Sequence, residues 1–152
     1  MGNDITAVIP TVSLTEVTMA WLLVVAAGVM IFSLFEAWLA TLIIYGQVKF
    51  LKKIFPATHN LIRSHVDYLM MTSLLVVTYF VCLHLNIILP AWVIVLLCIG
   101  VMYNPFGFFI KAINPKAGQS DTFAGKLMVC LAFLPTTIGF GYAMCAVIAV
   151  LV

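Results

Sequence analysis

Four long runs of apolar residues, separated by short polar segments, dominate the amino-acid sequence. An α-helix needs about 20 apolar residues to cross the hydrocarbon core of a bilayer, and each run reaches that length. The pattern predicts four helices, at roughly residues 14–49, 64–89, 91–113 and 123–151. The expected fold is therefore all-α, with one domain over residues 1–152 that forms a polytopic four-helix bundle in a membrane.

Charge refines this picture. The seven Lys and Arg residues form two clusters, one between the first and second runs and one between the third and fourth. Short loops rich in positive charge stay on the cytoplasmic side, so we expect both loops inside and both termini outside. Hydrophobic residues make up 65% of the chain and charged residues 8%, which excludes a soluble globule. A net charge of +2 gives no reason to expect nucleic-acid binding.

Prolines, glycines and asparagines mark the expected breaks between and within the helices. We expect a basic loop at residues 50–62 and a tight external turn at Asn86 and Pro90. The third helix is expected to be interrupted at Asn104 and Pro105, and a cytoplasmic loop to follow at residues 114–122. A bundle of this size encloses little space, so a homo-oligomer with pockets between its subunits is expected.

Several polar side chains are predicted to lie inside the membrane, where an ionisable group costs about 2.5–3.5 kcal/mol. Glu36 is nine residues before Tyr45, which places it roughly 13 Å from the cytoplasmic boundary and close to the midplane. It is either a protonated carboxyl bonded to a neighbouring helix or a functional group. Tyr103, Asn104 and Thr136 are expected at a similar depth. Together these four side chains predict either a polar pocket or a kinked packing interface.

The second helix opens with Arg63, His65 and Asp67. Arg63 and Asp67 are four residues apart and can pair along one helix face. His65 shares its stripe with Leu69 and Thr72, so we expect the imidazole to turn toward the bundle. A neutral histidine donates from one ring nitrogen and ligates iron or zinc through the other, and the simpler alternative is a polar anchor. The histidine spacings do not fit a zinc site.

From about residue 63 to 150 the chain resembles styrene oxide isomerase, a small four-helix bacterial membrane enzyme. The matching segments are Arg63-Ser64-His65, Asn104 with Gly107-Phe108-Phe109, the run from Gly118 to Phe123, and Leu134-Pro135. The resemblance implies a homotrimer in the bacterial inner (cytoplasmic) membrane, with haem b between its subunits. The family's histidine ligand falls on His65, beside Arg63 and Asp67. In that family the ferric iron acts as a Lewis acid on an epoxide, and a hydride shift gives the aldehyde.

Two positions depart from the family's pattern. Its catalytic tyrosine falls on Phe109, and an asparagine past the haem histidine falls on Met71. Tyr103 and Asn104 are the candidate catalytic groups in their place. The expected substrate is a small apolar epoxide that enters from the lipid. A haem-binding relative with different chemistry is an equal alternative.

A second resemblance is to the membrane-associated eicosanoid and glutathione enzymes, which are trimers of four-helix subunits. Their second helix begins with an Arg-x-x-x-Asn pattern that contacts glutathione, and the segment from Arg63 to Asp67 is similar, with an acid replacing the amide. Glutathione has two carboxylates, and Arg63 alone supplies too little positive charge for both. The third interpretation is a membrane subunit without catalysis, whose polar groups only fix helix packing.

Overall fold

The computed structural model describes residues 18–117 and 123–152, and every regular element in those ranges is a helix. The long helices are α1 (Ala20–Ile44), α3 (Thr58–His84), α4 (Ala91–Ile113) and α5 (Phe123–Leu151), and the short helix α2 (Lys49–Ile54) joins α1 to α3. All four long helices are long and apolar enough to cross a membrane. The predicted all-α bundle with four spans is confirmed, and the side on which the termini lie stays a prediction.

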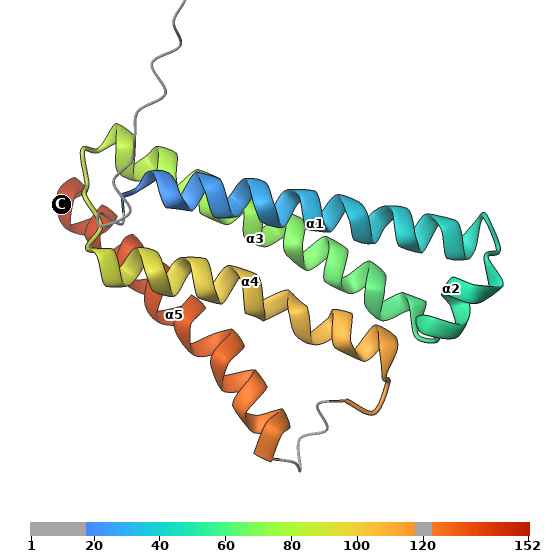
Figure 1. Cartoon of the computed structure of the whole chain (residues 1–152). Helices are drawn as coiled ribbons and strands as arrows, with labels where there is room; N and C mark the ends of the chain where they lie inside the picture. Colours follow the sequence, from blue (N-terminus) through green and yellow to red (C-terminus); the bar gives the residue numbers. More distant parts are fainter. Residues whose placement is uncertain (1–17, 118–122) are drawn as a thin grey trace, which may run out of the picture.

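The long helices follow one another in the order α1, α3, α4, α5, each running antiparallel to the next (Figure 1). The α1 helix packs along α3, and α3 packs along α4. The α5 helix meets α4 near the end of the bundle that holds the C-terminus, and it diverges from α4 toward Phe123 (Figure 1). All seven Lys and Arg residues lie in or near the α1–α3 and α4–α5 connections, at the opposite end from the C-terminus.

The seam between α1 and α3 follows from a heptad-like pattern in α1. Its buried residues recur at alternating spacings of four and three, which keeps one narrow stripe against a single partner helix. They are Leu22, Ala26, Val29, Ser33, Glu36, Ala40 and Ile43. The small members of this stripe let the two backbones approach closely, as is usual between helices in lipid. The same stripe brings one serine and one glutamate into the core.

The α4 helix continues through Pro105, so the predicted interruption at Asn104 and Pro105 is wrong. Proline has no N–H for the carbonyl one turn earlier, and in lipid such a turn needs donors from neighbouring helices. The carbonyl that loses its helix partner is that of Val101, and α3 contacts two other carbonyls of the same stretch. The Tyr68 hydroxyl donates to the carbonyl of Met102 at 3.0 Å, and Ser64 Oγ lies 3.3 Å from the carbonyl oxygen of Pro105. These contacts fasten α3 to the proline turn.

Several helix ends differ from those predicted. The first helix ends at Ile44 rather than at residue 49, and residues 14–17 lie outside the described part. Residues 50–54 of the predicted loop belong to α2, and α3 runs from Thr58 to His84 rather than from 64 to 89. A helix depends on backbone hydrogen bonds, which continue past the point where side chains become polar.

The tight turn after α3 is confirmed. Asn86 adopts a φ of 54°, and the amide of Ile87 donates to the carbonyl of Cys82 at 2.8 Å. This is the usual way in which a helix closes on a residue in the left-handed region. The predicted loop at 114–122 is a turn at residues 115–117, and residues 118–122 lie outside the described part.

The crossing of α4 and α5 depends on Gly100. A β-carbon at this position would lie 2.7 Å from the amide nitrogen and 2.8 Å from the Cα of Thr136, and these backbone atoms cannot turn aside. We expect Gly100→Ala to lower the free energy of unfolding by about 1–3 kcal/mol, the usual cost of overpacking. The measurement is SDS-induced unfolding in mixed micelles. The matched control is Gly141→Ala on α5, where an added carbon meets no atom within 4 Å. Equal stability of the two variants would contradict this account of the crossing.

Candidate functional site

Four polar side chains meet in the seam between α1 and α3. Ser33 and Glu36 come from α1, and Ser64 and His65 come from α3. Ser33, Glu36 and Ser64 have no exposed surface, whereas His65 is half-buried. Because residues 33 and 36 share the buried stripe of α1, the two serines pair across the seam with the glutamate and the histidine. The result is two adjacent polar contacts deep inside an apolar interface.

The first contact fixes the imidazole of His65. Its Nδ1 atom lies 2.8 Å from the backbone carbonyl oxygen of Ser33 and 2.8 Å from Ser33 Oγ. The Ser33 hydroxyl also donates to the backbone carbonyl of His65 at 3.1 Å. A carbonyl oxygen only accepts hydrogen bonds, so Nδ1 carries a proton and donates it to Ser33. In the neutral ring the lone pair is then on Nε2, the nitrogen suited to a metal.

The Nε2 atom is available for such a role. None of the described residues forms a hydrogen bond with it, and it is not among the enclosed atoms that lack a partner. A ligating histidine usually donates its other ring N–H to a carbonyl or carboxylate, which fixes the ring and its tautomer. His65 and the Ser33 carbonyl form this arrangement in the described structure, with Nε2 reaching the surface of the α1–α3 pair.

The second contact holds Glu36. Ser64 Oγ lies 2.7 Å from Glu36 Oε1 and 3.3 Å from the carbonyl oxygen of Pro105, while Oε2 is enclosed without a partner. The single proton of the Ser64 hydroxyl satisfies only one of its two contacts. Both are hydrogen bonds at once only when the carboxyl of Glu36 carries a proton and donates it to Ser64. Proton counting therefore favours a neutral Glu36 that links α1, α3 and α4.

A cavity of about 470 Å³ lies on the other side of α3, where α5 diverges from α4. We call it the α3–α5 cavity. Its walls are mostly apolar, and Met71, Phe106, Met128 and Ala132 are among the lining residues. The polar side chains that reach it are Asp67, Tyr103, Asn104 and Lys111. Asn104 Nδ2 lies 3.8 Å from the sulfur of Met71, so its amide has a weak acceptor and is available to a stronger one. The space fits a small apolar molecule with one polar group.

The structure divides the predicted site residues between these two places. Tyr103, Asn104 and Asp67 line the α3–α5 cavity, whereas His65 faces α1. Residues 65 and 67 are two positions apart on one helix, about 200° around its axis, so the imidazole and the cavity lie on opposite sides of α3. Arg63 is exposed, and no ion pair joins it to Asp67 among the described residues.

The predicted pocket shared by Glu36, Tyr103, Asn104 and Thr136 does not include two of these four residues, Glu36 and Thr136. Glu36 is enclosed in the α1–α3 seam, bonded to Ser64. The Thr136 hydroxyl donates to the carbonyl of Ala132 in its own helix at 2.8 Å. Similar depth does not bring side chains together when they lie on opposite faces of a helix.

The two positions at which styrene oxide isomerases have polar groups also lie in different places in this structure. Met71 lines the α3–α5 cavity, so that position keeps a place beside Asn104. Phe109 packs against other aromatic rings, with centroid distances of 5.5 Å to Phe32 and 5.8 Å to Phe55. A hydroxyl is therefore absent from the position of the family's tyrosine, and Tyr103 is the residue of α4 lining the cavity that carries one.

The sequence interpretation missed Ser33 and Ser64, the direct partners of His65 and Glu36. Ser33 is three residues before Glu36 and belongs to the same stripe, so the alternating spacing of α1 was a usable signal. Ser64 precedes His65 and entered the sequence interpretation only as part of the segment Arg63-Ser64-His65. Their roles depend on the register between α1 and α3, which a single sequence does not provide.

Comparison of the chain with protein-family models, curated proteins and solved structures finds no match. The geometry of the site therefore carries the functional argument. Within the described ranges, no group of three or more His, Cys, Asp or Glu side chains could hold a metal ion. Any metal bound there would need most of its ligands from another source.

Proposed function

We propose that the protein is a membrane haem protein of the bacterial inner membrane, in which His65 is the axial ligand of haem b. We further propose that it rearranges a small apolar epoxide from the bilayer into a carbonyl compound. One observation carries the haem assignment. The Nδ1–H of His65 is held by the Ser33 carbonyl at 2.8 Å, which leaves the Nε2 lone pair directed away from the seam.

The residues present fit this cofactor. A porphyrin supplies four nitrogen ligands itself, so the protein needs to contribute only one or two. The described residues offer one oriented imidazole and no cluster of three ligands, which suits haem better than a protein-only zinc site. When bound, the iron would act as a Lewis acid that stabilises negative charge on an epoxide oxygen.

A second copy of the chain completes the proposed site. His65 and the α3–α5 cavity lie on opposite sides of α3, so one subunit does not bring them together. In a homotrimer, the cavity of one copy would face the His65 surface of the next. This support for an oligomer is independent of the small size of the bundle, because the site is incomplete without a neighbour.

Within the cavity, the chain's own residues have distinct roles. The Tyr103 hydroxyl and the Asn104 amide are the uncharged donors of a mostly apolar space that also holds Asp67 and Lys111, and they would orient the oxygen of an apolar substrate. The apolar lining would hold the hydrocarbon part and keep water away from a reactive intermediate. The reaction is an isomerisation, so it requires no second substrate and gives no by-product.

The test is aldehyde formation from styrene oxide, used as a probe epoxide, by detergent-purified protein. We expect measurable turnover in the wild type. We expect at least a tenfold lower kcat/KM in Ala132→Phe, because Ala132 is buried and lines the cavity. The matched control is Leu134→Phe, an exposed position two residues away that does not line it. Absence of aldehyde in the wild type, or full activity in Ala132→Phe, would contradict the proposed reaction.

The glutathione alternative has less support. The cavity contains one cationic side chain, Lys111, and one anionic side chain, Asp67, while Arg63 does not line it. A tripeptide with two carboxylates would find a single cation and a repelling acid there. Retention on a glutathione matrix that Arg63→Ala abolishes would favour this alternative.

A further inference from the structure

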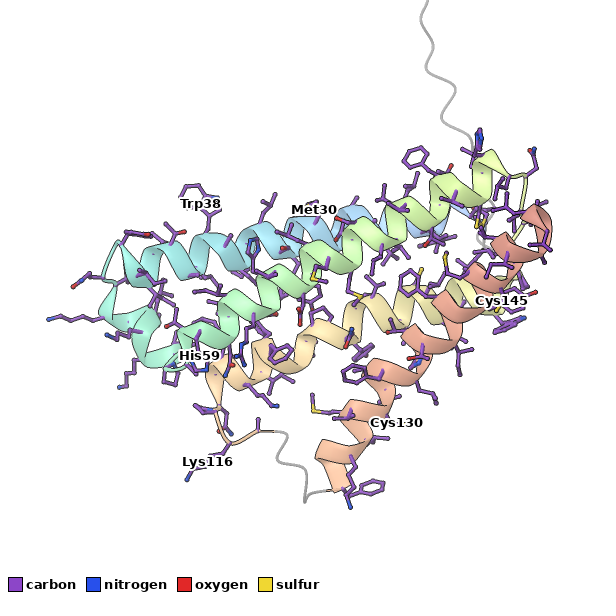
Figure 2. All side chains as sticks on the ribbon, turned by 180° about the vertical axis from the view of Figure 1, so that it is seen from behind. Met30, Trp38, His59, Lys116, Cys130 and Cys145 are labelled. Carbon is purple, nitrogen blue, oxygen red and sulfur yellow. The ribbon has the colours of Figure 1, made fainter. Side chains whose placement is uncertain are left out.

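The short helix α2 has two chemically different faces. Its apolar residues Leu51 and Ile54 pack on the cluster formed by Ala40, Ile43, Phe55, Leu61 and Ala112. At 100° per residue, the three lysines Lys49, Lys52 and Lys53 fall on the opposite face, and all three are exposed. The α2 helix is thus fixed to the end of the bundle with its ammonium groups turned outward. This end also holds His59 and Lys116 (Figure 2).

Two of these lysines border a recess of about 330 Å³ between the end of α1, α2 and the start of α3. We call it the lysine cleft. It is lined by Ile43, Ile44, Gln47, Lys49, Lys52 and Thr58. The lining includes two lysines and a glutamine as donors, the Thr58 hydroxyl donates to the carbonyl of Phe55 at 3.3 Å, and no acidic side chain is among the lining residues. This set of donors suits a phosphate group. Lys53, on the same short helix, does not line the cleft.

The apolar part of the cleft indicates where the rest of the ligand lies. Ile43 and Ile44, from the last turn of α1, form the apolar wall of the cleft, and Ile44 is 45% exposed whereas Ile43 is buried. Val48 and Phe50, on either side of Lys49 in the chain, are also apolar and exposed. A molecule whose phosphate occupies the cleft would have its hydrocarbon chains directly against α1. A phospholipid has both parts.

We propose that the lysine cleft binds the headgroup phosphate of an anionic phospholipid of the cytoplasmic leaflet. The expected membrane orientation places this end of the bundle in that leaflet, whose surface is negative. Lys49 and Lys52 contact the phosphate, the Gln47 amide donates to its oxygens, and the acyl chains start against the exposed side of Ile44. The site lies apart from the α3–α5 cavity and does not rest on the proposed function.

The test is native mass spectrometry of the full-length protein in detergent, titrated with dioleoyl phosphatidylglycerol or dioleoyl phosphatidylcholine. We expect the anionic lipid to bind more tightly than the zwitterionic one. A lysine near an anionic lipid strengthens binding about fivefold, so Lys49→Gln with Lys52→Gln should weaken binding of phosphatidylglycerol by at least about tenfold. The matched control is Lys53→Gln with Lys116→Gln, which removes the same charge from the same end outside the cleft. That pair should change binding by less than about threefold.

Three results would overturn the proposal. Equal binding of the two lipids by the wild type would show that the negative charge of the headgroup is not recognised. Equal losses in the two double variants would show diffuse attraction rather than a site. Displacement of the lipid by a large excess of inorganic phosphate would make free phosphate, rather than a phospholipid, the ligand. Because Lys49, Lys52 and Lys53 are exposed, the variants are expected to fold, and their melting temperatures in detergent check this.

Discussion

Replacing His65 with alanine should remove haem from the purified protein. The loss of affinity should exceed the 10- to 100-fold that is typical when only the hydrogen-bond partner of a ligand is removed, because the ligand itself is gone. The measurement is the Soret absorbance and the haem content of detergent-purified protein after reconstitution. His65 is half-buried at the surface of the seam, so the bundle should still fold.

Two further variants separate ligation from packing. His59→Ala changes an exposed histidine of the same helix and should leave the spectrum unchanged. Ser33→Ala removes the hydroxyl but keeps the backbone carbonyl that accepts the Nδ1 proton, so haem affinity should fall by less than about tenfold. A wild-type Soret band in His65→Ala would contradict the proposal that this imidazole ligates the haem iron, regardless of the results for the other two variants.

Glu36→Ala should be among the most destabilising single substitutions in the protein. The side chain is fully enclosed at the junction of α1, α3 and α4, so its removal leaves a cavity and deprives Ser64 of a partner. We expect a loss of about 2–4 kcal/mol in the free energy of unfolding, most of it from the cavity. A hydrogen bond between membrane helices averages only about 0.6 kcal/mol, so the bond to Ser64 is the smaller part. SDS-induced unfolding in mixed micelles measures the change.

The conservative variant tests the protonation state. Glutamine has the shape of a neutral glutamic acid and can donate to Ser64 Oγ, so Glu36→Gln should cost less than about 1 kcal/mol. Ser73→Ala is a control for hydroxyl loss, because Ser73 is exposed and bonds only the carbonyl of Leu69 in its own helix. If Glu36→Gln destabilised the protein as much as Glu36→Ala, the seam would require a charged carboxylate, and the proton-counting argument would be wrong.

Much of the fold was readable from the sequence, since lipid requires long apolar helices and a tight turn needs a residue such as Asn86. The α2 helix was not, because six residues give too little periodicity to separate a short helix from a basic loop. The continuation of α4 through Pro105 was also missed. The breaker residue is visible in the sequence, but the donors on Tyr68 and Ser64 that stabilise its turn come from another helix.

The site was readable only in part. Depth along each helix can be counted from the sequence, and Glu36, predicted near mid-span, is fully buried within the bundle. Rotation about the helix axis decides which side chains meet, and it depends on packing against other helices. This is why His65 and Asp67, two residues apart, lie on opposite sides of α3, and why Ser33 went unnoticed as the partner of His65.

The most direct measurement of the central claim is a cryo-EM map of the protein in lipid nanodiscs, prepared with added haem. The account predicts porphyrin density against Nε2 of His65 on the α1–α3 surface, with the α3–α5 cavity of a neighbouring copy on its other side. A map in which this imidazole contacts only lipid, with no porphyrin beside it, would contradict the account.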